Sequence, residues 1–147
     1  MRDRMTRIVL PAMLVALLSV VGCAQEPPEE PAWPPLEGTS WYLEALGPTG
    51  NVRPVLTTTE VTLSFTEGSQ VAGSAGCNLY FGQYSSGEDG TFAVSGLGST
   101  KMFCNQPGVM QQEQDLLNGL QSAERYEVSG GLLHITGGGI ELVLSPA

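Results

Sequence analysis

Short apolar or alternating runs recur from residue 36 onward, and Gly, Pro, Asn and Ser separate one run from the next. In "VTLSF", residues 61–65, the first, third and fifth side chains are apolar and the two between them carry hydroxyl groups. A strand with one face against a core requires this alternation, because successive side chains point to opposite faces of a sheet. The repeated pattern predicts a meander of antiparallel strands.

Further strands are predicted at "TSWYLEAL", "QVAGSAG", "LYFGQYS", "TFAVSG", "RYEVSG", "LLHITG" and "IELVLS". The last three runs are joined by turns centred on Gly130-Gly131 and on residues 137–139, which have the composition of hairpin turns. The 147 residues include 19 glycines and 10 prolines, which favours a turn-rich β protein over a helical bundle. A chain of this length suffices for one domain with additional segments.

Residues 105–124, "NQPGVMQQEQDLLNGLQSAE", do not follow the alternating pattern of a strand. Polar residues separate apolar ones that recur at helical spacing, namely Met110, Leu117, Leu120 and Ala123. This pattern predicts a single amphipathic helix, for which Asn105 and Pro107 supply start signals. A lone helix in a β meander is expected to plug one end or one face of the sheet.

The first quarter of the chain predicts export. Residues 1–7 contain three arginines, and residues 8–21, "IVLPAMLVALLSVV", form an uncharged apolar stretch. This stretch is shorter than the about 20 residues of a transmembrane helix, so it predicts a secretory signal. It ends in "VVGC", residues 20–23, which resembles the bacterial lipobox. The resemblance implies cleavage before Cys23 and a diacylglycerol on its sulfur. The alternative is a plain cleaved signal followed by a chance cysteine.

We therefore divide the chain into a signal peptide (1–22), a lipidated cysteine with a Pro/Glu-rich tether (23–35) and one folded domain (36–147). Two or more acyl chains hold a protein firmly at a bilayer. The expected location is thus the exported face of a cell membrane or outer membrane, with the bilayer as one partner. The tether is expected to be stiff and extended. Within it, Trp33 is expected either near the lipid headgroups or, the option we favour, packed back on the domain.

The charge distribution argues against nucleic acid as a partner. The net charge is −9, and the cations after residue 7 are Arg53, Lys101 and Arg125. Such an acidic surface repels nucleic acid phosphates.

Two cysteines remain once Cys23 is assigned to lipid. Cys77 and Cys104 lie in a domain that would fold outside the reducing cytoplasm, where pairing is the expected state. Closing this loop would stabilise the fold by roughly 3 kcal/mol on the chain-entropy model. A pair of buried free thiols is the alternative, because the sequence does not say how closely the two Cα atoms approach.

Several segments together resemble the META domain family, also called HslJ-like. An entry strand with "WYL" precedes "AGCNLYFGQY", which is followed by "STKMFC" and "VMQQE" in the family's order and spacing. Phe103 departs from the small residue often found at its position. The matching residues are Trp41, Tyr42, Leu43, Phe65, Gly73, Gly76, Cys77, Asn78, Tyr80, Gly82, Tyr84, Thr100, Met102, Cys104, Met110 and Glu113.

The resemblance implies a mainly β fold with one α-helix, in which the antiparallel meander forms a partial, lipocalin-like barrel plugged by the helix. The family is found on exported and lipid-anchored proteins and has been linked to heat-shock response, antibiotic tolerance and secretion. It offers no catalytic residues to transfer. Its signature residues suit structural roles, with Gly76 and Gly82 allowing unusual backbone or close approach, Asn78 closing a turn, and Tyr80 and Tyr84 supplying aromatic area.

No combination of residues predicts a reaction centre. His134, the single histidine, shares a strand face with Leu132 and Thr136, which predicts a rim or exposed position. A Cys-His pair could in principle be catalytic, but both cysteines are better explained as disulfide partners. One histidine, two such cysteines and scattered carboxylates do not supply a closed zinc set, so no metal and no cofactor is expected.

Three further motifs are interpreted as structural. "SGLGSTK", residues 95–101, lacks the order of a phosphate-binding loop and is predicted to be a loop. Glu88 and Asp89 are interpreted as a solvated turn. Glu113 and Asp115 lie two apart on the predicted helix and so point in different directions, with Glu113 expected to contact the first helical turn or a neighbouring loop.

The leading hypothesis is a non-enzymatic, lipid-anchored envelope protein that contributes to stress tolerance or binds another envelope component through its loops. One alternative is a carrier of a small apolar ligand, with Trp41, Phe65, Tyr80 and Tyr84 near the barrel mouth. Another is an inhibitor of an extracellular hydrolase that uses a disulfide-pinned loop.

Overall fold

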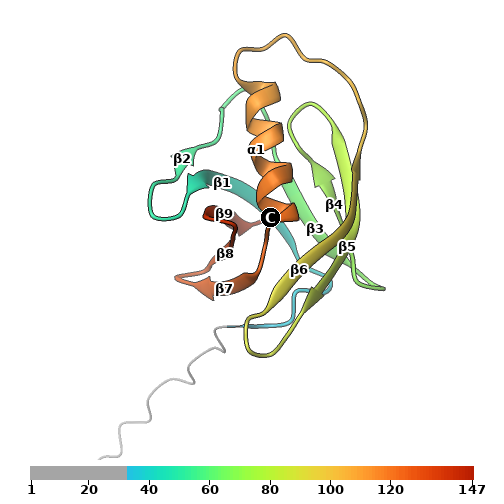
Figure 1. The fold of residues 1–147 in the computed structure, drawn as a ribbon, viewed down its shortest axis with the longest axis vertical. Coiled ribbons are helices and arrows are strands. Elements are labelled where there is room, and N and C mark those ends of the chain that lie inside the picture. Colours follow the sequence, from blue (N-terminus) through green and yellow to red (C-terminus); the bar gives the residue numbers. More distant parts are fainter. Residues whose placement is uncertain (1–32) are drawn as a thin grey trace, which may run out of the picture.

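The computed structural model describes residues 33–147 (Figure 1). The predictions of a signal peptide at 1–22 and of lipidation at Cys23 fall on residues outside this range, and so does the part of the predicted tether that precedes Trp33. Trp33, the first described residue, lies against the domain: a side chain added at Gly90 would come within 2.3 Å of the indole nitrogen. This contact agrees with the favoured placement of Trp33 on the domain.

Within residues 33–147, nine strands form one antiparallel sheet, and one helix lies between β6 and β7. The sheet order is β6-β5-β4-β3-β1-β9-β8-β7, and the short β2 pairs with β1. The elements are β1 (Ser40–Pro48), β2 (Arg53–Pro54), β3 (Thr62–Thr66), β4 (Gln70–Ser74), β5 (Leu79–Ser86), β6 (Phe92–Ser99), α1 (Val109–Gln121), β7 (Arg125–Ser129), β8 (Leu132–Gly137) and β9 (Ile140–Pro146).

The sheet curls until its two edge strands meet at one end. There Phe92 N–H donates to the carbonyl of Glu124 at 2.8 Å, and Tyr126 N–H donates to the carbonyl of Gly90 at 2.9 Å. Away from this end the edges diverge, and α1 lies against β1, β6, β8 and β9 (Figure 1). The predicted partial barrel plugged by a single helix is confirmed.

The core is the inside of this half-barrel. Alternate residues face inward in most strands, including Leu63 and Phe65 of β3, as the alternation in residues 61–65 predicts. The helix contributes Leu116 and Leu120. Burying a side chain of this size stabilises the fold by about 1.5–3 kcal/mol. The sheet therefore needs the helix, because without it the inward faces of its strands would meet water.

Both predicted glycine turns are tight hairpins. Gly130 and Gly131 link β7 to β8, and Gly138 and Gly139 link β8 to β9. All four have positive φ angles, between 57° and 79°. A two-residue turn with positive φ at both positions matches the right-handed twist of the strands, and glycine adopts it without steric strain.

Two local predictions were wrong, and one short strand was missed. The segment "SGLGSTK" is not a loop throughout, because β6 continues to Ser99; Gly96, with a φ of 60°, forms part of a bulge and does not end the strand. The pair Arg53–Pro54 forms an extra short strand. The helix starts after Gly108, whose φ of 82° is left-handed, and no side chain of Asn105 or any other residue caps it. Within residues 33–147, no helix combines the length and apolar character that a membrane span requires.

Candidate functional site

Asn78 is the centre of a buried polar network just before β5. Its Nδ2 donates to Glu113 Oε1 at 2.7 Å and to the carbonyl of Met102 at 3.1 Å. Its Oδ1 accepts from Thr100 Oγ1 and from Met102 N–H, both at 2.7 Å. A carboxamide has two N–H donors and two acceptor lone pairs, so the side chain of Asn78 is saturated. The carboxylate on one side and the donors on the other fix the orientation of this amide.

Glu113 and its neighbour Gln112 attach the helix to two different segments. Glu113 Oε2 accepts a second bond, from the backbone N–H of Asn78 at 2.8 Å. Gln112 accepts from Leu56 N–H at 2.7 Å and donates to Thr59 Oγ1 at 3.0 Å. Both helix side chains are buried. Among the described residues, every buried side-chain nitrogen or oxygen has a hydrogen-bond partner. These polar groups therefore position α1, and Glu113 contacts a neighbouring loop as expected.

The segment from Thr100 to Cys104 is held at several points. Asn78 binds it at two residues, and a disulfide joins Cys104 to Cys77 with a Cα–Cα distance of 6.0 Å. Cys104 N–H also approaches Met110 Sδ at 3.5 Å. The expected disulfide is present, and the alternative of two free thiols is not. The bridge and the amide network together fix the backbone of this segment.

The fixed segment and the adjoining strand present large apolar side chains to solvent. Leu79 and Phe81 on the outward face of β5 are 63% and 59% exposed, and Met102 and Phe103 are 60% and 79% exposed. Two hydrogen bonds place the segment beside the strand, from Thr100 N–H to the carbonyl of Leu79 and from Leu79 N–H to Thr100 Oγ1. We call these four side chains the outer apolar face.

The aromatic residues that the ligand-carrier alternative places near the barrel mouth lie in the core, which contradicts that placement. Trp41, Phe65, Tyr80 and Tyr84 are all buried. Phe65 and Tyr84 pack edge to face with ring centroids 4.8 Å apart. The hydroxyl of Tyr80 donates to the carbonyl of Thr62 at 2.7 Å, and burial raises the pKa of this phenol. These side chains fill the interior that an enclosed ligand would need.

Two signature glycines also have structural roles. Gly76 has a φ of 104°, a left-handed conformation that residues with a side chain rarely adopt, and it precedes the disulfide. Gly82 lies in the bulge between β5 and β6, where an added Cβ would come within 3.1 Å of the carbonyl of Ser95. Both positions therefore match the structural roles predicted from the sequence.

The structure does not bring the candidate catalytic residues together. His134 is half-buried on β8, and its Nδ1 lies 3.1 Å from Glu141 Oε1 on β9. Hydrogen bonds from Gly50 N–H and from His134 hold the pKa of Glu141 below its usual value, although partial burial opposes them. Asp115 forms an ion pair with Arg53, whereas Glu113 binds Asn78, so the two carboxylates have different partners. Among residues 33–147, no cluster of three His, Cys, Asp or Glu side chains is placed to hold a metal ion.

The arrangement of signature residues agrees with a comparison to known families. The sequence profile of the META domain matches residues 34–147. The chain belongs to the META domain family. The residues that the profile covers include the whole half-barrel, the helix and the disulfide.

Solved structures share this fold. An NMR structure of a protein from Burkholderia xenovorans has 26% sequence identity and a TM-score of 0.65, and the match covers 83% of this chain and 97% of that one. A second protein solved by NMR has 21% identity and a TM-score of 0.58 over 73% of this chain and 87% of its own. A crystal structure of a DUF4847 family protein from Bacteroides vulgatus has 12% identity and a TM-score of 0.52, covering 73% and 91%. No curated protein matches the chain.

Sequence reasoning missed the outer apolar face of this META domain. Strand alternation places Leu79 and Phe81 opposite the core, but it does not show that the segment with Met102 and Phe103 lies beside them. The departure of Phe103 from the family's usual small residue was the one signal. The burial of Gln112 was also missed, because polar helix residues are ordinarily assigned to solvent.

Proposed function

We propose that this META domain protein is a non-catalytic, lipid-anchored protein of the cell envelope that binds another envelope component through the outer apolar face. The observation that carries the proposal is the exposure of Leu79, Phe81, Met102 and Phe103 on a backbone fixed by Asn78 and by a disulfide. Clusters of exposed apolar side chains in soluble domains mark interaction sites.

The rigidity of the segment favours binding over a purely structural role. A side chain as exposed as Phe103 contributes little to the stability of its own domain, because most of its surface stays in water. A surface that is already ordered loses less conformational entropy when it binds. The buried network thus supports a contact surface without itself taking part in the contact.

The position of this surface suits a domain that is tethered at its N-terminal end. Figure 1 shows the described chain entering at the end of the barrel that carries the β5–β6 turn, where Trp33 contacts Gly90. The segment between β6 and α1 arches over the opposite end (Figure 1). A tether from Cys23 to Trp33 would span at most about 35 Å when extended. It would hold one end of the domain near the bilayer and leave the end with Phe103 facing outward.

Membrane fractionation tests the anchor. The wild-type chain is expected in the membrane fraction, with an intact mass that includes lipid on a species starting at Cys23. The Cys23→Ser variant is expected in the soluble exported fraction or as uncleaved precursor. A wild-type chain without lipid mass would refute the anchored state.

Site-specific photo-crosslinking in cells tests the contact surface. A benzophenone side chain at position 103 is expected to give a discrete adduct that Leu79→Ser diminishes. The matched control places the same group at Tyr42, an exposed aromatic residue on β1. Equal adducts from both positions, or none from position 103, would contradict a specific contact at the outer apolar face.

A further inference from the structure

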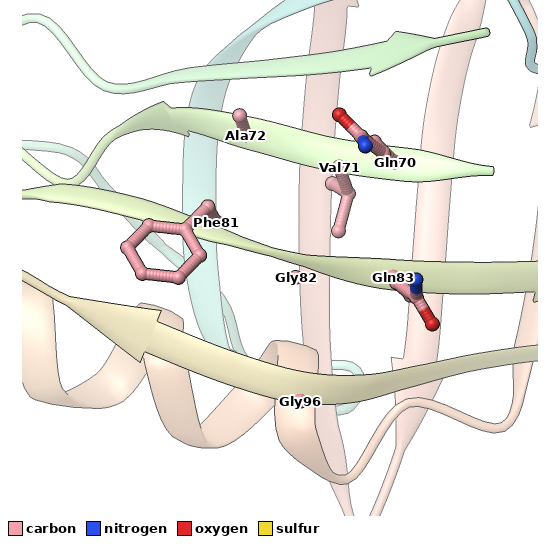
Figure 2. Close-up of a pocket in the computed structure, with 7 residues that line it drawn as sticks. All are labelled: Gln70, Val71, Ala72, Phe81, Gly82, Gln83 and Gly96. Atoms are coloured by element: carbon pink, nitrogen blue, oxygen red, sulfur yellow. The ribbon is translucent and has the colours of Figure 1, made fainter. Parts of the chain in front are cut away.

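A groove of about 500 Å³ opens on the outward face of β4, β5 and β6. Figure 2 shows Phe81 at one end of it and the side chains of Gln70 and Gln83 at the other. Ala72 and Gly96 lie between them along neighbouring strands (Figure 2). Phe81 belongs both to this groove and to the outer apolar face.

A β-bulge shapes the floor of the groove. Phe81 pairs with Gly98 and Gln83 pairs with Ser95, so the single residue Gly82 lies opposite two residues of β6. One of the two is Gly96, where a Cβ would meet no atom within 4 Å. A side chain at this position would project into open space beside the floor. Bulges of this kind occur preferentially next to functional sites, and glycine in a strand marks places where a ligand approaches the backbone closely.

The ring of Phe81 forms an aromatic platform at one end. A Cβ at Gly98 would come within 3.0 Å of the ring, so glycine at this position lets the ring lie over β6. The ring packs on the strand with one side and remains 59% exposed. Figure 2 shows the ring beside the groove with no side chain of the lining residues covering it.

Two carboxamides stand together at the other end. Gln70 and Gln83 are register partners on β4 and β5, so their side chains leave the same face of the sheet side by side. Each carboxamide offers both donors and an acceptor. The lining contains no charged residue, although the whole chain carries a net charge of −9. The groove therefore offers no counter-charge to a phosphate or a carboxylate.

We propose that this groove binds a neutral, β-linked sugar chain. The C–H faces of an equatorially substituted pyranose are flat and apolar and would stack on Phe81. Its hydroxyl groups both donate and accept hydrogen bonds, as the carboxamides of Gln70 and Gln83 do. The inference rests on the proposed function, since it names the envelope component as a glycan. An aromatic wall with a few convergent polar groups, in a groove of this volume, is the usual form of a small-molecule site.

The test is a titration of the full chain, in a detergent without a sugar headgroup, followed by NMR of backbone amides and by calorimetry. The β-linked probes are chitotetraose and cellotetraose, and α-linked maltotetraose is the comparison. Saturable shifts are expected at Gly82, Gln83 and Gly96 with a β-linked probe, at a Kd of about 1 mM or tighter. The α-linked chain, which curves, is expected to bind more weakly.

Matched variants distinguish binding in the groove from nonspecific binding elsewhere on the surface. Phe81→Ala is expected to weaken binding about tenfold or more, and Gln83→Ala is expected to weaken it severalfold. Both residues are exposed, so both variants should fold, which their amide spectra will show. Tyr42→Ala removes an exposed aromatic ring outside the groove and is expected to leave binding unchanged.

The absence of saturable binding of either β-linked probe up to about 10 mM would overturn the inference. So would binding that survives Phe81→Ala, or shifts that map elsewhere. If sugars fail to bind while position 103 still gives a specific adduct in cells, the glycan inference falls and the proposed function stands. If sugars bind but the chain carries no lipid, the site stands and the anchored state falls.

Discussion

Replacing Asn78 by alanine removes the centre of the buried network and should strongly destabilise the domain. The substitution deletes three hydrogen bonds to neutral groups, each worth about 1 kcal/mol, and one to the carboxylate of Glu113, worth about 1.5–3 kcal/mol. These bonds share partners and do not add fully. The expected loss in the free energy of unfolding is about 3–5 kcal/mol, a large part of the 5–15 kcal/mol typical of domains.

Urea unfolding of the oxidised chain, followed by circular dichroism, measures this loss. With a slope of about 1.5 kcal/mol/M, the unfolding midpoint should fall by about 2–3 M. The matched control is Asn118→Ala, which removes the same side chain from an exposed position on α1. It should change stability by no more than about 0.5 kcal/mol, with alanine favoured by helix propensity.

Two results would refute this reasoning. One is a loss below about 1 kcal/mol for Asn78→Ala, which would mean that water replaces the amide without cost. The other is full additivity of Asn78→Ala and Glu113→Ala in a double-mutant cycle. The contact between amide and carboxylate should instead give a coupling energy of about 1–3 kcal/mol.

Three further predictions concern stability. Replacing both Cys77 and Cys104 by serine should lower the free energy of unfolding by about 3–4 kcal/mol, given a sequence separation of 27, and a chemical denaturation curve that matches the oxidised wild type would contradict this. Because the pKa of Glu141 is lowered in the folded state, its carboxylate stabilises the fold at pH values above its unfolded pKa, and this contribution disappears as the pH falls through the folded pKa. Lowering the pH should therefore reduce the free energy of unfolding of the wild type more than that of Glu141→Gln. Parallel plots of this free energy against pH for the two proteins would contradict the stabilising role of the Glu141 carboxylate. Gly73→Ala should destabilise the domain by more than about 3 kcal/mol, because the new Cβ would lie 1.9 Å from the carbonyl oxygen of Thr62, and an unchanged thermal midpoint would show that the strands can separate at no cost.

Local rules predicted the elements of this fold except β2, but not all of their limits. The alternation in residues 61–65 and the paired glycines at 130–131 depend only on neighbouring residues, so the strand and the turn could be identified from the sequence. The same rules misread Gly96 as part of a loop. In the folded chain this glycine lies in a bulge of β6, where pairing with β5 continues on both sides of it. Whether a glycine ends a strand or bends it depends on the partner strand, which the local sequence does not contain.

The candidate site likewise has features that the sequence predicts and features that depend on contacts between distant segments. The family pattern marks Asn78, Thr100, Met102 and Glu113 as related positions, and the cysteine count predicts one bridge. The family pattern does not show that the side-chain amide of Asn78 binds the other three residues, because those contacts join residues that are 22 to 35 positions apart in the sequence.

The sequence by itself predicted the kinds of elements and their order apart from β2, the inward face of the strand at residues 61–65, and a bridge between the two cysteines as the expected state, because these follow from residue spacing and from the expected compartment. Only the tertiary structure decided that the segment before α1 lies beside β5 and that four apolar side chains of this segment and strand are exposed. It alone also decided that a bulge opens a neutral groove beside Phe81. Both features depend on how the sheet curls and where the helix anchors, and these are set by packing between segments far apart in the chain.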